Sequence, residues 1–198
     1  MAPPANRHTA AIQHKRDKHR REDMLYDGTH LNWYGQGSYP ATSGLKDESG
    51  DYRAANFQTQ KDHGPIPDGR YALHLTKASA AQVQQVGPGQ YELLSADGIQ
   101  DIEQIKLPGG SMGHSSAWGD NRVKLHTLHI DNAAARNRGG FFIHDSHKGY
   151  THGCVEVAPQ FFHDLRRFAA KHHWRGTLVL KVRYPKADSS THGDTDRP

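Results

Sequence analysis

The chain has 198 residues, 34% of them hydrophobic, and its 25 Lys and Arg against 21 Asp and Glu give a formal net charge of +4. This length fits one domain with tails, and no apolar run approaches the roughly 20 residues that cross a membrane, so we expect no membrane partner. The single cysteine excludes a disulfide within the chain, and folding therefore does not depend on an oxidising compartment. The mild basic charge suits an anionic partner, either a cell-wall polymer or a nucleic acid, without choosing between them.

The two ends of the chain are polar. Residues 1–23 form a basic arm that lacks the apolar stretch of a secretory signal peptide. We therefore expect this arm to be disordered and the protein to be made in the cytoplasm and exported by another route. Residues 186–198 are predicted to be a second disordered tail, which leaves residues 24–185 as the folded domain.

The pattern between the two ends predicts a mainly β domain. In chain order, strands are predicted at residues 24–26, 31–34, 39–44, 70–75, 91–94, 122–130, 140–144 and 177–184. Residues 79–86 favour one or two helical turns, and residues 95–122 are predicted to be a long loop. Apolar residues at helical spacing after Pro159 predict one helix over residues 159–172.

The segment between Phe141 and Val157 carries the reactive side chains. An apolar strand ends at His144, a polar loop follows, and Cys154 comes immediately after His152 and Gly153. A free thiol is mostly protonated at neutral pH, and a histidine within hydrogen-bond reach can accept its proton. We therefore predict Cys154 as a nucleophile, His144 as its base, and the amides of His152, Gly153 and Cys154 as an oxyanion hole.

These residues also carry a resemblance. Thr151-His152-Gly153-Cys154-Val155 is similar to the signature of L,D-transpeptidases, and Phe142-Ile143-His144 resembles the strand that presents their catalytic histidine. The wider set of blocks resembles the L,D-transpeptidase effectors of bacterial type VI secretion. Those blocks lie at residues 25–35, 39–44, 64–71 and 117–119, and the resemblance runs from about residue 24 to 184.

The resemblance implies a β-sandwich or barrel of the L,D-transpeptidase type with one helix after the cysteine. It implies attack of the thiol on a tetrapeptide stem of peptidoglycan, loss of D-alanine, and a thioester that water or a D-amino acid resolves. No cofactor or metal is implied. The backbone carbonyl of Asp145 is a candidate to orient His144, and four further residues are candidates for substrate contact: Tyr39, Ser43, Thr151 and His147.

The resemblance also implies a setting. Such effectors act in the periplasm of a target cell, so the expected partners are peptidoglycan stem peptides, components of the secretion apparatus and a cognate immunity protein, with no nucleic acid. Two positions depart from housekeeping enzymes. Glu156 stands where they usually carry Arg, and Asp145 stands where a small residue is usual.

Two other functions use the same segment. His144, His147, His152 and Cys154 offer the nitrogen and sulfur ligands of a zinc site, although no C-x-x-C pair is present. A catalytically inactive module that binds the cell wall is the other alternative, and it predicts that replacing Cys154 leaves the biological effect intact.

Overall fold

The computed structural model describes residues 21–78, 82–102 and 118–196. Within these ranges it is mainly β, with one α-helix and a curled sheet, which confirms the predicted fold class. No helix in the described ranges is both long and apolar enough to span a membrane.

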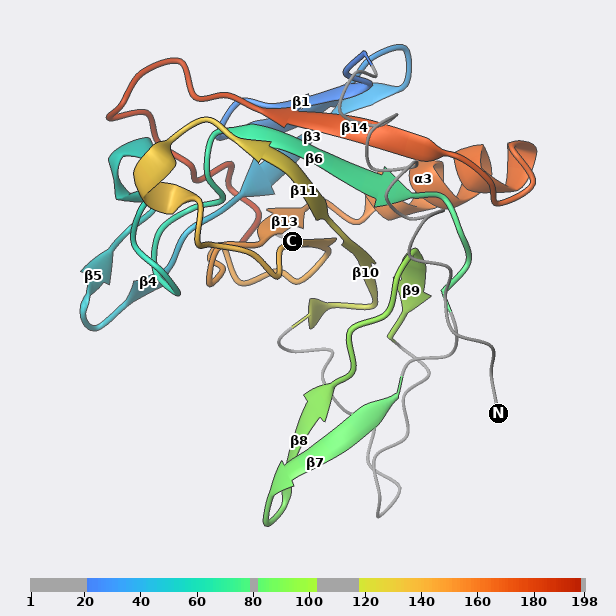
Figure 1. Cartoon of the computed structure of the whole chain (residues 1–198), viewed down its shortest axis with the longest axis horizontal. Coiled ribbons are helices and arrows are strands. Elements are labelled where there is room, and N and C mark those ends of the chain that lie inside the picture. Colours follow the sequence, from blue (N-terminus) through green and yellow to red (C-terminus); the bar gives the residue numbers. More distant parts are fainter. Residues whose placement is uncertain (1–20, 79–81, 103–117, 197–198) are drawn as a thin grey trace.

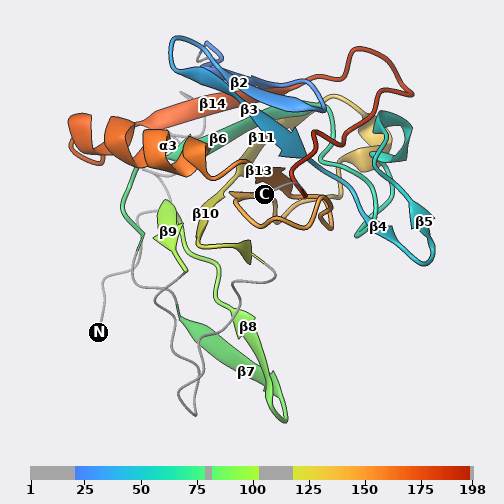
Figure 2. The same ribbon diagram turned by 180° about the vertical axis from the view of Figure 1, so that it is seen from behind.

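The core of the fold is a ten-stranded sheet. Its strands in spatial order are β11 (His126–Ile130), β6 (Gly69–His74), β14 (Thr177–Val182), β1 (Met24–Tyr26), β2 (His30–Trp33), β3 (Gly37–Thr42), β13 (Val155–Val157), β12 (Phe142–His144), β10 (Asn121–Lys124) and β9 (Ile99–Asp101). β10 and β11 lie near opposite ends of this order, yet only Leu125 separates them in the chain. The sheet therefore curls back on itself, with β14, β6 and β11 in one layer and β13 and β10 in the other (Figures 1 and 2).

The space between the layers is filled by apolar side chains that alternate along the strands. β14 is buried along nearly its whole length because it lies between β6 and β1, with the helix packed on the sheet. That burial explains why its sequence is almost continuously apolar rather than alternating.

The helix α3 (Gln160–Lys171) follows β13 directly, close to the predicted range. It buries Phe161, Phe162, Leu165 and Ala169, the face that the sequence spacing predicts. Phe161 packs against Trp33 and Tyr39, with ring centroids 5.9 and 5.5 Å apart. The helix thus covers β2 and β3 and fixes the end of β13, the strand that begins immediately after the cysteine.

Smaller elements lie outside the ten-stranded sheet and the helix. They are the hairpin β4 (Lys46–Asp47) and β5 (Gly50–Asp51), the 3-10 turns η1 (Ala55–Phe57) and η2 (Ala133–Ala135), and the hairpin β7 (Val83–Gly87) and β8 (Gln90–Leu93). The last hairpin projects away from the body in both views (Figures 1 and 2).

Three local predictions need correction. The helical turns predicted within 79–86 are wrong for residues 83–86, which pair with β8 as a strand. The predicted strand 122–130 is interrupted at Leu125, where the chain passes from one layer to the other. The predicted loop 95–122 contains β9 and the first residues of β10, while residues 103–117 lie outside the described ranges.

The C-terminal tail is also not as predicted, because residues 186–196 pack onto the domain. Thr191 is buried and donates from its hydroxyl to the carbonyl of Ser43 at 2.6 Å, while the Ser43 amide donates back to the Thr191 carbonyl at 2.8 Å. Ser190 forms a bridge with Ala54. Polar composition favours disorder, but the hydroxyl of Thr191 satisfies a backbone carbonyl inside the fold. Residues 1–20 of the predicted N-terminal arm lie outside the described ranges.

Candidate active site

The structure places the two predicted reactive residues at neighbouring parallel strands. His144 ends β12, and Cys154 immediately precedes β13, which pairs with β12. No hydrogen bond joins the thiol to the imidazole in the part of the chain that the structure describes. Hydrogen bonds between catalytic residues are often long in a free enzyme and shorten when substrate binds. The lack of a hydrogen bond between the thiol and the imidazole is therefore compatible with roles as nucleophile and base.

A row of four buried polar residues crosses the sheet at this point. Arg122 pairs with His144, His144 with Glu156, and Glu156 with Thr42, so the row runs across β10, β12, β13 and β3. Each of the four is at most 2% exposed. Partners in a ladder direct their side chains to the same face, and we call these four residues the polar row.

The polar row fixes the proton on His144 through a neighbouring serine. The Ser146 hydroxyl lies 3.1 Å from Nδ1 of His144 and donates its proton in a very short hydrogen bond to a carboxylate oxygen of Glu156. A hydroxyl has one proton, so Ser146 accepts the N–H of Nδ1. This assignment leaves Nε2 as the basic nitrogen of the imidazole.

Glu156 is fully buried, yet its carboxylate has a full set of donors. Besides Ser146, it accepts from the amides of Lys148 and Gly149 at 3.0 and 2.7 Å and, at 2.5 Å, from the hydroxyl of Thr195. Buried carboxylates are tolerated only with such compensation. Glu156 therefore holds the loop after His144 and the C-terminal segment to the same point.

Burial dominates the protonation of the reactive pair. It raises the pKa of Cys154 to about 11, although the Phe142 backbone and the cations of Lys148, Arg122 and Arg138 oppose the shift. It lowers the pKa of His144 to about 3, with help from the charges of Lys148 and Arg122. At neutral pH the free protein therefore holds a thiol and a neutral imidazole, so the proton has to move as the nucleophile attacks.

Hydroxyl groups hold the peptide carbonyl of the cysteine. Ser43 and Thr151 both donate to the carbonyl oxygen of Cys154, at 2.7 and 2.6 Å. Thr151 is buried and also accepts, at 3.2 Å each, from the amides of Gly44 and Gly153. Ser43 and Thr151 thus position the nucleophile loop, and their contact with a substrate stays a prediction.

The glycine before the cysteine is required by its conformation and by its neighbour. Gly153 has φ +107°, and a Cβ there would lie 2.5 Å from Nη2 of Arg138. Arg138 in turn donates to the carbonyls of Gln58, Gly64 and Pro65 at 2.6–2.8 Å. Because the amide of Gly153 already donates to Thr151, the amides of His152 and Cys154 are the remaining oxyanion candidates from the predicted set.

The other predicted residues are distributed around the site. Tyr39 is buried and donates to Asp164 of α3 at 2.9 Å, so it ties β3 to the helix, and its contact with a substrate stays a prediction. Asp145 accepts from the amides of Asp120 and Asn121 at 2.8 Å, which anchors the start of β10. The contact recorded for Nδ1 of His144 is Ser146, where the sequence suggested the carbonyl of Asp145.

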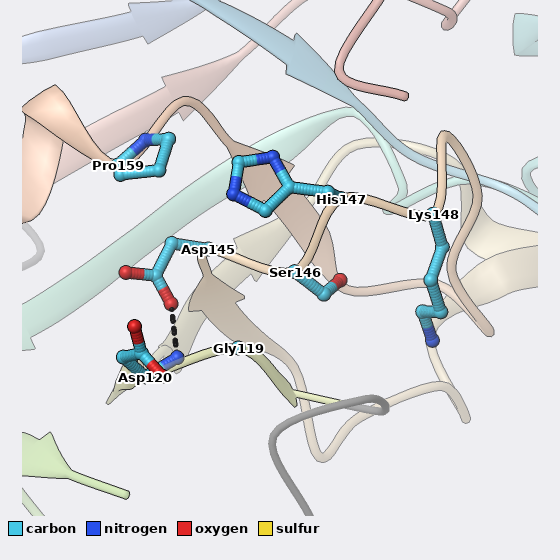
Figure 3. A pocket seen from close by; sticks show the side chains of 7 residues that line it. All are labelled: Gly119, Asp120, Asp145, Ser146, His147, Lys148 and Pro159. Carbon is cyan, nitrogen blue, oxygen red and sulfur yellow. Dashed lines mark hydrogen bonds between the residues drawn. The ribbon is translucent and has the colours of Figure 1, made fainter. Parts of the chain in front are cut away.

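A hollow of about 400 Å³ opens beside the base. Its lining residues, labelled in Figure 3, are Gly119, Asp120, Asp145, Ser146, His147, Lys148 and Pro159. His147 lies on its wall, and its contact with substrate stays a prediction, while the imidazole of His152 reaches the carbonyl of Asp62 at 2.9 Å. Ser146 lines the hollow and contacts His144, but neither His144 nor Cys154 is among the lining residues.

The structure does not favour a zinc site at the reactive pair. Across residues 21–78, 82–102 and 118–196, no three of His144, His147, His152 and Cys154 bring ligand atoms within 4.8 Å of one another. The ring nitrogens of His144 and His152 that have recorded contacts are directed to Ser146 and to the Asp62 carbonyl.

Sequence reasoning missed three residues that shape the site. Arg122 lies with its guanidinium 4.6 Å from the ring centroids of both Trp118 and Phe142, and Trp118 packs edge-on against His144 at 5.3 Å. Ser146 follows the base by two residues. Only Ser146 had a local signal, since a hydroxyl beside a strand-end histidine is a candidate partner, whereas Arg122 and Trp118 reach the site through the sheet.

Comparisons with known proteins add no assignment. No protein-family model matches the chain, and no curated protein matches its sequence. The function is therefore inferred from the geometry of the site and from the sequence resemblance.

Proposed function

We propose that this protein is a cysteine-dependent acyl-transfer enzyme of the L,D-transpeptidase class. The observation that carries the proposal is the network in which Glu156, through Ser146, holds the proton of His144 on Nδ1. This network supplies a neutral, oriented base on the strand beside the only cysteine of the chain.

The proposed reaction begins with proton transfer from the thiol of Cys154 to Nε2 of His144 as sulfur attacks the carbonyl of the L-centre in a tetrapeptide stem. The tetrahedral oxyanion is stabilised by the amides of His152 and Cys154. His144 then returns the proton to the departing amine of D-alanine, the C–N bond breaks and a thioester remains. Water yields a tripeptide, whereas a D-amino acid yields an exchanged stem.

The cations around the site favour a thiolate on Cys154, while Lys148 and Arg122 oppose an imidazolium on His144. The cations of Lys148, Arg122 and Arg138 stabilise negative charge on sulfur, so they favour attack once the proton has left. His144 is neutral at physiological pH because burial lowers its pKa to about 3. It can therefore accept the proton without first losing one.

Mass spectrometry of tetrapeptide muropeptides incubated with the protein tests the proposal. The wild type is expected to release D-alanine or to exchange it for an added D-amino acid, and Cys154→Ala to do neither. His129→Asn is a matched control, because His129 is exposed on β11 away from the site. Thermal unfolding of each variant checks that the fold is intact. Turnover by Cys154→Ala, or no turnover by a folded wild type, would contradict the proposal.

We also propose, from the sequence resemblance, that the protein is an antibacterial toxin. In this proposal a type VI apparatus delivers the protein, which acts in the periplasm of the target cell. An immunity protein blocks its active site. Expression directed to the periplasm is expected to be toxic, while cytosolic expression is tolerated. Equal toxicity in both compartments, or full toxicity of Cys154→Ala, would overturn this part and would favour an inactive wall-binding module.

A further inference from the structure

Two imidazoles and a carboxylate meet at the surface of the sheet, outside the site described above. His74 ends β6 and His126 begins β11, the antiparallel strand beside it. Their rings stack with centroids 4.5 Å apart. Asp97, in the segment between β8 and β9, contacts both: its two oxygens lie 2.8 Å from Nδ1 of His74 and 2.8 Å from Nε2 of His126.

These three side chains have the chemistry and spacing of a metal site. One ligand atom from each lies within 4.8 Å of the other two. In a tetrahedral zinc site, with bonds about 2.0–2.2 Å long, ligand atoms lie about 3.4 Å apart. Because the nitrogen-to-oxygen separations are already shorter than this, small rotations of the side chains are enough to admit an ion.

The carboxylate is held in place before any ion binds. The amide of Gly98 donates to Asp97 at 2.9 Å, and a Cβ at Gly98, which has φ +87°, would lie 2.4 Å from the carbonyl oxygen of Thr76. A carboxylate held in this way between two imidazoles reduces the cost of organising the ligands.

We propose that His74, Asp97 and His126 bind a divalent transition-metal ion, zinc in the first place, with solvent as the remaining ligand. Two imidazole nitrogens with one carboxylate oxygen suit zinc and its neighbours in the transition series, whereas calcium and magnesium prefer oxygen ligands alone. The side chains of His74, His126 and Asp97 are 24, 33 and 51% exposed, which gives the ion a route of entry and the solvent ligand a place.

The position of the site indicates a structural role. His74 and Asp97 stand at the two ends of the excursion that carries the hairpin β7–β8, so a bound ion would fasten the base of this arm to β11 (Figure 1). The arm also reaches the polar row, because Arg122 donates to the carbonyl of Leu94 at 2.6 Å. Metal binding is therefore expected to stabilise the arm and to take no part in the acyl transfer.

Isothermal titration of the untagged, chelator-treated full chain with zinc chloride tests the site. Other histidines can also bind zinc, including the surface cluster His192, Asp194 and Asp196, so His192→Asn and His129→Asn serve as controls. One ion per chain is expected, with affinity at least about tenfold weaker in His126→Asn and Asp97→Asn. Both controls are expected to match the wild type, and zinc is expected to raise the melting temperature of the wild type and the controls alone.

A parallel titration of Cys154→Ala separates this site from the reactive pair. Binding that persists in Cys154→Ala and is lost in His126→Asn supports the proposal. Binding that disappears with Cys154→Ala or His192→Asn, or no binding to the wild type at about 100 μM zinc, overturns it. These outcomes are independent of the muropeptide assay, so failure of the metal site and failure of the acyl-transfer proposal are distinguishable.

Discussion

His144 and Glu156 are direct partners across the parallel ladder of β12 and β13, and a hydroxyl lies between their side chains. The sequence marks Glu156 as a departure from housekeeping L,D-transpeptidases, which usually carry Arg there. In the structure this residue faces inward, toward Ser146 and the base. Under the proposed function, Glu156 therefore orients the imidazole through Ser146 and is not a substrate contact.

The first prediction tests Glu156 and Ser146 as positioning residues. Ser146→Ala removes the hydroxyl that links Nδ1 of His144 to the carboxylate, so the ring loses its fixed proton. Glu156→Gln replaces one carboxylate oxygen by an amide N–H₂. This donor then faces a hydroxyl or backbone N–H that donates to the carboxylate in the wild type. For each variant we expect kcat for D-alanine release to fall by about 10²-fold, with little change in KM, and the acid limb of the pH profile to move.

Ser190→Ala is the matched control for this pair, because Ser190 is exposed and its hydroxyl accepts only from the amide of His192 at 3.2 Å. It is expected to retain the wild-type rate and pH profile. Wild-type kcat and an unchanged pH profile in both Ser146→Ala and Glu156→Gln would contradict the positioning role.

The second prediction concerns how the reactivity of the Cys154 thiol depends on pH. Burial raises the pKa of Cys154 to about 11, so alkylation of the free protein by iodoacetamide is expected to be slow at pH 8 and to rise as pH approaches 11. The single cysteine makes mass spectrometry a direct readout. Fast, pH-independent labelling between pH 6 and 8 would show a thiolate in the resting enzyme and would refute this prediction.

The third prediction links the base to stability. Burial lowers the folded-state pKa of His144 to about 3, below the unfolded value of about 6.5. Between these values the unfolded chain binds a proton that the folded chain does not, so stability rises with pH across this window. Urea unfolding from pH 4 to 7 is expected to show this slope, and His144→Asn is expected to reduce it. An equal slope in the variant would exclude His144 as the source.

The sequence predicts the strands and the helix well because their patterns are local. The spacing of Phe161, Phe162 and Leu165 encodes the buried face of the helix directly. The prediction fails at residues 83–86, where two Gln are compatible with a helix but two Val favour a strand and pairing with β8 decides the outcome. Local patterns also give no sign that β10 and β11 belong to different layers.

The site divides in the same way. Cys154 and His144 can be predicted because they stand in a short sequence motif. The hydrogen bond from Thr195 to Glu156 joins residues 39 positions apart. Arg122 contacts the rings of Trp118 and Phe142 only through the packing of the folded chain. Contacts of this kind depend on the register of the sheet, which composition does not encode. The polar composition of the C-terminal segment predicts disorder, whereas its threonines pack onto the domain.

The fourth prediction tests the packed C-terminal segment. The Thr195 hydroxyl donates its one proton to Glu156 and accepts from the hydroxyl of Thr42, so Thr195→Val leaves a buried carboxylate and a hydroxyl each short of one partner. We expect a loss of about 1–3 kcal/mol in the free energy of unfolding and a lower kcat. Asp188→Asn, at an exposed position of the same segment, is expected to have no effect on either quantity. Equal stability of both variants would show that the segment does not support Glu156.

The last prediction isolates the role of the glycine before the nucleophile. Gly153 and Gly89 both have positive φ, at +107° and +69°, but a Cβ at Gly153 would meet Arg138 whereas a Cβ at Gly89 would meet nothing within 4 Å. Each Ala substitution carries the backbone penalty of roughly 1–2 kcal/mol. Gly153→Ala must in addition displace Arg138 or the loop that carries Cys154.

We therefore expect Gly89→Ala to lower the melting temperature modestly and to keep full D-alanine release. Gly153→Ala is expected to lower the melting temperature further and to abolish turnover, because the sulfur moves relative to His144. Thermal unfolding and the muropeptide assay on the same two preparations measure both effects. If Gly153→Ala were as active as Gly89→Ala, the position of the Cys154 loop would not depend on the close approach to Arg138, and the nucleophile would have to be held by Ser43 and Thr151 alone.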